Sequence, residues 1–178
     1  MPSVLQNQVE RGGSVGHRAN FVVIQAGIAT AYHDQWAALG STWAFAAGPD
    51  EALSATATAE ETSELLDWAF AEAGYLVDFD ERQAIVFGYP EMGELDFEEI
   101  PELEEEMVDS MQETEAALQR GPLDFLQAIG GNWQGWRLHW DDRGVDAFAE
   151  YLNERGIRSI ATQPRSHPDD RSRVSFQA

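Results

Sequence analysis

Two aspartates placed two positions apart, Asp78 and Asp80, form a candidate metal-binding or acid–base pair. They lie in the alternating segment 75–80, which is typical of a β-strand, so both carboxylates are expected on one face. Two carboxylates placed in this way can hold a divalent cation together with waters, or act as an acid and a base. The alternative is a solvated strand face, with Glu81-Arg82 as the turn of a hairpin.

Histidines are the other candidate metal ligands or bases. A small metal-assisted enzyme would combine Asp78 and Asp80 with His33 or His139. However, no pair of histidines has the i, i+4 or close-loop spacing that is typical of zinc sites. The sequence also lacks a G-x-S-x-G motif, a P-loop and a dinucleotide-binding fingerprint. Ordinary core or surface histidines are therefore the alternative, and no cofactor is expected.

The strongest feature of the composition is the position of the negative charge. Residues 19–119 contain 23 acidic residues and one basic residue, Arg82, whereas the two ends together are close to neutral. The net charge of the 178 residues is −21, and all basic residues are Arg. Such a field repels nucleic acid and anionic membranes and attracts basic partners. A basic protein is therefore the expected partner.

Within this region, residues 91–115 hold 12 acids and no base. A solvated helix face is one explanation, and a surface that fills the basic cleft of a nuclease or toxin is the other. In the second case, the partner-binding set combines the acids of the segment with one aromatic anchor: Glu98, Glu99, Glu102, Glu104, Glu105, Glu106, Asp109 and Tyr89.

An aromatic row forms a third candidate site. Segment 132–140 contains three tryptophans, and on a strand Trp136, Leu138 and Trp140 share one face, with Arg137 and His139 on the other. An exposed row of this kind can anchor a protein partner or stack on a ring. The alternative is a core face of the sheet, covered by a helix over 145–154.

The chain is expected to fold as one domain. Its length and its hydrophobic fraction of 43% suit a globule with a substantial core. No Cys is present, so neither disulfides nor thiol chemistry is expected. No apolar run approaches the roughly 20 residues of a membrane span, and the first 16 residues lack the apolar segment of a secretory signal. These observations predict a cytoplasmic protein.

Hydrophobic periodicity and Gly and Pro positions predict hairpins interleaved with helices. This order predicts an α+β fold with a mainly antiparallel sheet and packed helices. We expect a flexible arm over 1–16, a single globular domain over 17–162 and a disordered tail over 163–178. The predicted elements are hairpins over 19–33 and 75–87, a helix starting at 49, helices over 62–73, 101–119, 122–129 and 145–154, and strands over 136–140 and 157–161.

Several short motifs resemble those of a family of small, uncharacterised proteins common in actinobacteria. The segment 18–23 matches its R-A-N-[YF]-V-V start, and Tyr32-His33, Trp36 and Gly48-Pro49 match its H-W and G-P motifs. Residues 78–88 resemble its D-x-D-x-R…F-G hairpin, and 133–144 its W-x-G-W…W…G segment. This chain departs from the pattern in the acidic insert 91–115, in its tail and in two residues between His33 and Trp36. The resemblance implies a fold pattern and no catalytic residue.

Three functions follow from these observations. The first is a non-enzymatic acidic binding protein, of the type of the immunity proteins that neutralise bacterial toxins or nucleases. The second is a small metal-assisted enzyme that uses Asp78 and Asp80. The third is a salt-adapted housekeeping domain, whose acids retain hydration and need no dedicated partner.

Overall fold

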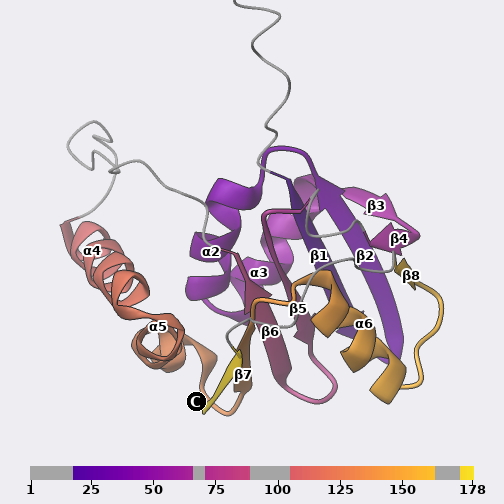
Figure 1. Cartoon of the computed structure of the whole chain (residues 1–178). Coiled ribbons are helices and arrows are strands. Elements are labelled where there is room, and N and C mark those ends of the chain that lie inside the picture. The colour runs from indigo at the N-terminus through magenta and orange to yellow at the C-terminus, as the bar shows by residue number, and fades with distance from the viewer. Residues whose placement is uncertain (1–17, 66–70, 89–104, 163–172) are drawn as a thin grey trace, which may run out of the picture.

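The computed structural model describes residues 18–65, 71–88, 105–162 and 173–178 (Figure 1). At its centre lies a seven-stranded sheet in the order β3-β2-β1-β5-β6-β7-β9. A second, two-stranded sheet pairs β4 with β8. The strands are β1 (Ala19–Gln25), β2 (Ile28–Asp34), β3 (Glu60–Thr62), β4 (Glu64–Leu65), β5 (Ala73–Asp78), β6 (Gln83–Phe87), β7 (Arg137–Asp141), β8 (Ala161–Thr162) and β9 (Arg173–Gln177).

The fold is α+β, but the sheet is mixed, which corrects the expectation of a mainly antiparallel sheet built from hairpins. The hairpins β1–β2 and β5–β6 form as predicted, with antiparallel pairing. They are joined side by side through a parallel β1–β5 contact, and β6 pairs in parallel with β7. The β6–β7 contact is parallel because the connection that contains α4 and α5 returns the chain in the direction of β6. The β1–β5 contact is parallel because β5 runs opposite to β2, the second strand of the first hairpin.

The helices lie on both faces of the sheet (Figure 1). Those predicted over 122–129 and 145–154 occur with these bounds, and the helix predicted from Pro49 starts there. The helices are α2 (Ala38–Ala46), α3 (Pro49–Ala55), α4 (Glu105–Arg120), α5 (Pro122–Ile129) and α6 (Val145–Glu154), with short 3-10 turns at Thr56–Thr58 and Gly130–Trp133.

The first core lies between the sheet and the layer of α2, α3 and α5. Trp133 packs on Phe45 with ring centroids 4.6 Å apart, and its indole N–H donates to the Phe45 carbonyl oxygen at 2.8 Å. Trp136, Leu138 and Trp140 also belong to this core. The aromatic row is thus buried, and α5, not the 145–154 helix, packs beside it. Burial of large rings on this scale is a main contribution to folding.

The second core lies on the opposite face of the sheet, under α6. Phe148 packs edge to face on Phe87 at 5.5 Å, and Val22, Ile24 and Leu76 complete the contact from β1 and β5. The apolar face of α6 therefore covers the middle of the sheet. This placement leaves the α6-facing side of β7 and β9 outside the second core.

Three of the predicted segments are wrong. Of the strand predicted over 157–161, only residue 161 lies in a strand, β8. The segment predicted as a helix over 62–73 contributes Thr62 to β3 and forms β4, and by Ala73 the chain has entered β5. The tail predicted to be disordered contributes β9, which pairs with β7 at the sheet edge. Its alternation of half-buried Val174 and Phe176 with exposed neighbours is the period-two pattern of an edge strand. The predicted arm over 1–16 lies outside the described residues.

Candidate functional site

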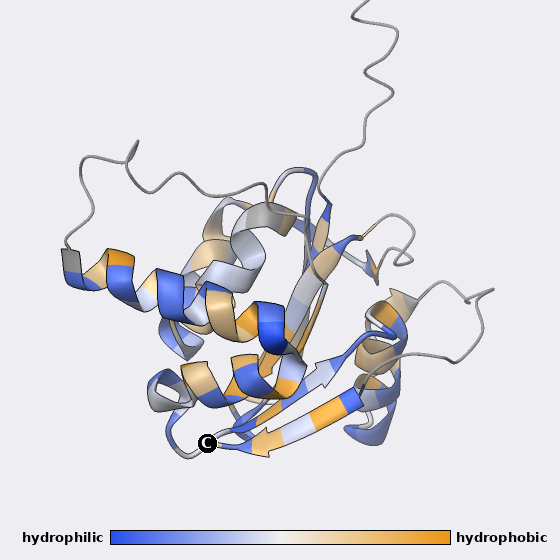
Figure 2. Cartoon of the chain, turned by 60° about the vertical axis from the view of Figure 1, so that its left-hand side comes forward, coloured by the Kyte–Doolittle hydropathy of each residue, from blue (hydrophilic) through white to orange (hydrophobic). Residues whose placement is uncertain are grey.

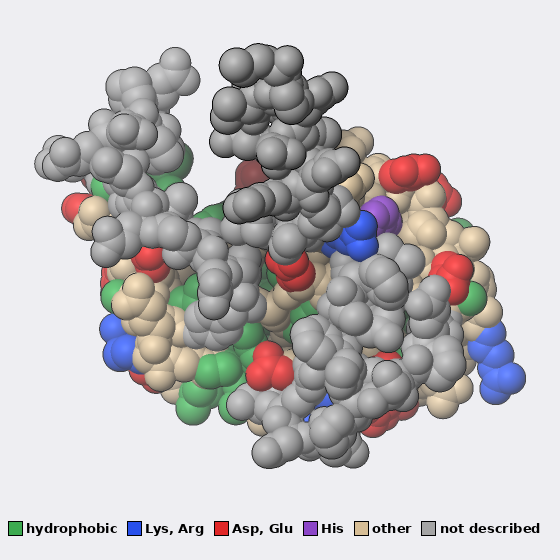
Figure 3. All heavy atoms as spheres, turned by 45° about the horizontal axis from the view of Figure 1, so that its top comes forward, with side chains coloured by type: hydrophobic (Ala, Val, Ile, Leu, Met, Phe, Trp, Pro, Cys, Tyr) green, Lys and Arg blue, Asp and Glu red, His purple; other side chains and the backbone are tan. Residues whose placement is uncertain are grey.

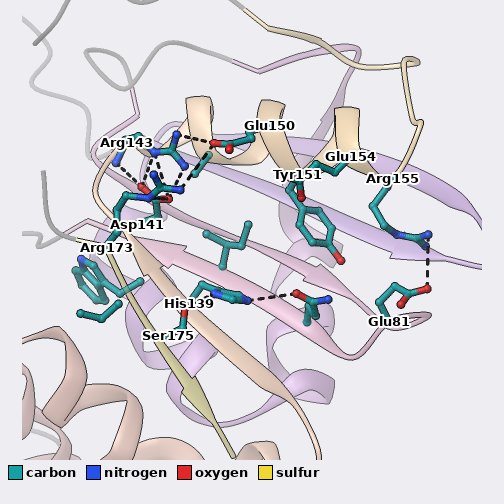
Figure 4. A pocket seen from close by; sticks show the side chains of 15 residues that line it. Glu81, His139, Asp141, Arg143, Glu150, Tyr151, Glu154, Arg155, Arg173 and Ser175 are labelled. Carbon is teal, nitrogen blue, oxygen red and sulfur yellow. Dashed lines mark hydrogen bonds and ion pairs between the residues drawn. The ribbon is translucent and has the colours of Figure 1, made fainter. Parts of the chain in front are cut away.

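An open pocket with a volume of about 320 Å³ lies between α6 and the part of the sheet formed by β6, β7 and β9 (Figure 4). Its floor is formed by the α6-facing side chains of β6, β7 and β9, and its wall by α6. The lining residues are Glu81, Gln83, Ile85, His139, Trp140, Asp141, Arg143, Ala147, Glu150, Tyr151, Glu154, Arg155, Arg173, Val174 and Ser175.

Three uncharged polar side chains form a row across the floor. Ser175 lies directly opposite His139 in the β7–β9 register, and its Oγ is 2.7 Å from His139 Nδ1. On the other side, Gln83 Oε1 is 3.3 Å from His139 Nε2. Because an amide oxygen can only accept, the contact with Gln83 Oε1 is a hydrogen bond in the tautomer that carries the ring proton on Nε2. In that tautomer Nδ1 is an acceptor, and the Ser175 hydroxyl can donate to it.

Burial lowers the pKa of His139 below its ordinary value, and the Arg137 guanidinium on the same strand lowers it further, against the opposing effect of Asp141. Both causes disfavour the charged imidazolium. The ring is therefore neutral at pH 7, which is the state that can accept a proton.

One end of the pocket is closed by an ion-pair cluster. The Arg143 guanidinium binds Asp141 through Nε and Nη2, the latter at 2.8 Å, and also pairs with Glu150 of α6. Arg173 of β9 reaches the same Asp141 carboxylate through Nε at 3.2 Å. The hydrogen bond from Arg143 to the Asp141 carboxylate is the largest of the causes that raise the Arg143 pKa. The cluster thereby ties α6 to β7 and β9.

The other end is built around Asp78, which is fully buried at the end of β5. Its Oδ2 accepts from the Tyr151 hydroxyl and from Arg155 Nε, both at 2.7 Å. Its Oδ1 accepts from the backbone N–H groups of Asp80 and Glu81 in the β5–β6 turn. All of these bonds hold α6 and the turn to the sheet.

Asp80 lies in the turn after β5, not on the strand face that the alternation predicted. Its two carboxylate oxygens accept from the N–H groups of Ala26 and Gly27 at 2.8 and 2.7 Å, and these bonds lower its pKa. Asp80 therefore caps the turn of the first hairpin. Both aspartates bind groups of the protein itself, so the pair stabilises the fold.

The structure does not bring the predicted metal-ligand set together. His33 lies on β2, and three strands separate it from His139 on β7, so that the two are about 19 Å apart at 4.8 Å per strand. Across the described parts of the chain, no three His, Asp or Glu side chains converge as a metal site would require.

Of the predicted partner-binding residues, Tyr89, Glu98, Glu99, Glu102 and Glu104 lie outside the described residues. Glu105 begins α4, and Glu106 and Asp109 are exposed on this helix, as is Glu113. These acids lie far from the pocket, because α4 packs mainly on α5, which covers the opposite face of the sheet (Figure 1).

Sequence reasoning missed the ion-pair cluster and Ser175. The signal for Ser175 was present, since Arg173-Val174-Ser175-Phe176-Gln177 alternates as a strand. The polar composition around it led instead to the prediction of disorder. No such signal exists for Tyr151 and Arg155, because their partner Asp78 is more than 70 residues away.

No family model, no curated protein and no solved structure matches the chain. None of the helices in the described part has both the length and the apolar character needed to cross a bilayer.

Proposed function

We propose that this chain is an acidic binding protein of the immunity type, which neutralises a basic protein partner such as a toxin or nuclease. The proposed contact surface is the acidic segment that includes α4. The observation that carries the proposal is an acidic stripe, defined as Glu106, Asp109 and Glu113. These three residues are spaced i, i+3 and i+7, so they share one face of the helix, and all three are exposed.

Among the described residues, the acidic stripe has no paired counter-charge. Within the described ranges, no Arg forms an ion pair with Glu106, Asp109 or Glu113. The arginines Arg143, Arg155 and Arg173 pair instead with acids around the pocket. Like charges gathered on one helix repel one another and destabilise the free protein. A basic surface that binds them would neutralise this repulsion.

The attachment of α4 also supports a docking role. Its C-terminal turn is anchored by buried Ala117 and Leu118, and its main contact in the described chain is with α5. Nearer its N-terminus, Met107 is 50% exposed beside the acidic stripe. Figure 2 shows hydrophilic and hydrophobic residues alternating along this helix. A flexible Met next to acids suits a basic partner surface with apolar residues at its centre.

The acids would act mainly on the rate of association. Complementary charge steers diffusional encounter and makes it sensitive to salt, whereas rim charges add little to the affinity itself. The acids Glu98, Glu99, Glu102 and Glu104, which precede α4 in the sequence, would extend the same field.

The salt-adapted domain is a second candidate, because exposed acids also occur far from α4. Asp50, Glu51, Glu60 and Glu61 are exposed on α3 and β3, and Figure 3 shows acidic side chains spread over the described surface of one face. Dispersed acids retain hydration without a partner. This candidate predicts poor folding at low ionic strength and recovery in molar salt. The metal-assisted enzyme loses support, because Asp78 and Asp80 bind protein groups.

A capture experiment with a matched control tests the proposal. The bait is the full chain, used against lysate of the source organism at low salt and at about 0.5 M salt, where the Debye length is a few ångström. The test variant carries Glu106→Gln, Asp109→Asn and Glu113→Gln. The control carries Glu51→Gln, Glu60→Gln and Glu61→Gln, so that both have the same net charge.

We expect the wild type and the control to capture one stoichiometric basic protein at low salt. The test variant should capture much less of it, and 0.5 M salt should weaken every capture. Equal loss in both variants would show that only net charge matters, and no capture by the folded wild type would contradict the proposal.

A further inference from the structure

We propose that Ser175 is a nucleophile for acyl transfer, with His139 as its general base, and that the pocket accepts small carboxylic esters. This inference goes beyond the proposed binding function and does not depend on it. It also departs from the expectation of a non-enzymatic protein. It rests on the row Gln83–His139–Ser175 at the pocket floor.

The direction of the hydrogen bonds around His139 decides whether Ser175 can be activated. A serine hydroxyl becomes a nucleophile when a neighbouring base accepts its proton, and a third group holds that base in the correct tautomer. His139 Nε2 is 3.3 Å from Gln83 Oε1 and Nδ1 is 2.7 Å from Ser175 Oγ; in the tautomer protonated at Nε2, Gln83 accepts the ring proton and Nδ1 faces the Ser175 hydroxyl as an acceptor. The three side chains come from three adjacent strands, β6, β7 and β9, so the backbone fixes their relative positions.

The protonation state of the base is the second requirement. His139 is half-buried, and burial together with Arg137 keeps its pKa below the ordinary value, so the ring is free to accept a proton at pH 7. Charged and titratable groups face His139 from β7, β9 and α6, from the β5–β6 and β7–α6 turns, and from the residue after α6. They are Arg137, Asp141, Arg143, Glu150, Tyr151, Glu154, Arg155, Arg173 and Glu81.

Access for a substrate is the third requirement. Ser175 is exposed on the edge strand, and the pocket in front of it is open to solvent. Ile85 and Ala147 give the floor and wall a small apolar surface that suits a short acyl chain. Arg173 lies two residues from Ser175 on the same strand face, with its side chain 57% exposed. Its Nε and Nη2 pair with Asp141 and Glu150, and the proposal gives the same guanidinium the further role of stabilising an oxyanion that develops beside Ser175.

The reaction balances with water as the only co-reactant. Ser175 Oγ forms a bond to the ester carbonyl carbon while its proton passes to His139 Nδ1, and the carbonyl electron pair moves to oxygen. The oxyanion then re-forms the carbonyl and expels the alkoxide, which takes the proton from Nδ1. In a second round, water attacks the acyl-Ser175 ester, His139 accepts its proton and returns it to Ser175 Oγ, and the carboxylic acid leaves.

The same hydrogen bonds also tie β9 to the sheet, so the test must separate a nucleophile from a cross-strand contact. The probe is a fluorophosphonate, whose phosphorus is attacked by an activated serine with loss of fluoride. Intact-mass measurement gives the rate of adduct formation on the full chain, and peptide mapping locates the adduct. Hydrolysis of p-nitrophenyl acetate gives an independent readout of acyl transfer.

We expect one adduct on Ser175, absent in Ser175→Ala and retained in Ser54→Ala, which removes an exposed serine of α3. His139→Gln should slow labelling of Ser175 by about 100-fold, the usual effect of a general base. Circular dichroism establishes that each variant is folded. The proposal is overturned if the folded wild type forms no adduct at Ser175, or if His139→Gln labels Ser175 as fast as the wild type.

Gln83 is a positioning residue. The pH dependence of the labelling rate distinguishes this role from a purely structural one. The rate of labelling should fall in acid with the midpoint of His139 titration, below pH 6.5. Gln83→Glu keeps an acceptor opposite Nε2 and adds a negative charge, which raises the His139 pKa and should shift the midpoint upward. Gln83→Leu removes the acceptor and should slow labelling at pH 7. An unchanged midpoint in folded Gln83→Glu would contradict this role.

Discussion

The Tyr151 hydroxyl donates to Asp78 Oδ2 at 2.7 Å, and this bond joins α6 to the end of β5 across 73 residues of sequence. Burial and the hydrogen bond to Asp78 raise the pKa of Tyr151, so the phenol stays protonated and keeps the proton that it donates to the carboxylate. With Arg155 on the same oxygen, the Asp78 carboxylate is the point at which helix, turn and sheet meet. It has an architectural role, although its sequence context resembles that of a metal ligand.

Asp78→Asn should be strongly destabilising. The amide keeps one acceptor oxygen but removes the charge that pairs with Arg155, and it places an N–H₂ group among four donors. Breaking a buried pair of this kind costs about 3 kcal/mol or more. Urea unfolding measures the loss, and Asp109→Asn on α4 is the matched control, expected within about 0.5 kcal/mol of the wild type. A similar effect of both substitutions would be inconsistent with the described geometry.

Tyr151→Phe isolates the hydroxyl from the packing of the ring. Because the ring of residue 151 remains in the second core, only the hydrogen bond to the Asp78 carboxylate is lost. Hydrogen bonds to charged groups contribute about 1.5–3 kcal/mol, and we expect a decrease of this size in the free energy of unfolding. In the background of Asp78→Asn, the same change should cost much less. Additive losses in this double-mutant cycle would show that the two residues do not interact.

The low pKa of His139 makes stability depend on pH in a defined direction. Since the folded state holds its proton less tightly than the unfolded state, the unfolded chain binds more protons as the pH falls below 6.5. This contribution to stability is complete above pH 6.5 and is lost between 6.5 and the lower folded-state pKa. His139→Gln removes the contribution. The difference in unfolding free energy between pH 7.5 and pH 5 should therefore be smaller in His139→Gln than in the wild type, and an equal or larger difference would contradict the assignment.

The turn of the first hairpin offers a stabilising substitution. Ala26 and Gly27 both have positive φ, 50° and 75°, as the type I′ turn of a two-residue hairpin requires. This region costs an ordinary L-residue about 1 kcal/mol or more, whereas Asn adopts it readily. Ala26→Asn should therefore raise the unfolding free energy by about 1 kcal/mol. Ala116→Asn on the exposed side of α4 is the control and should lower it, because Asn is a poorer helix former than Ala.

The sequence predicts the local structure of this protein better than its long-range contacts. Hairpins, α5 and α6 follow from turn residues and apolar spacing, which act over a few positions. The parallel β1–β5 and β6–β7 contacts depend on where long crossovers return the chain, and no local pattern records this. The prediction of a helix over 62–73 was wrong. Leu65, whose spacing suits a helix face, lies in strand β4 and is buried there.

The candidate site was only partly predictable for the same reason. His139 was recognised as a candidate base, but its partners Gln83 and Ser175 lie 56 and 36 residues away. Asp78 and Asp80 were recognised by their spacing, yet their role depends on Tyr151, Arg155 and the first hairpin turn. The spacing of ligands along a strand cannot distinguish a metal site from a site that binds the protein's own donors.

Hydrogen exchange of the chain, alone and with the captured basic partner, is the most direct test of the proposed function. We expect slower exchange in the complex over residues 105–120, with little change in α6, β7 and β9. Addition of 0.5 M salt should reduce the protection as the complex weakens. Unchanged exchange over 105–120, with protection elsewhere or nowhere, would contradict the claim that the acidic segment of α4 binds the partner.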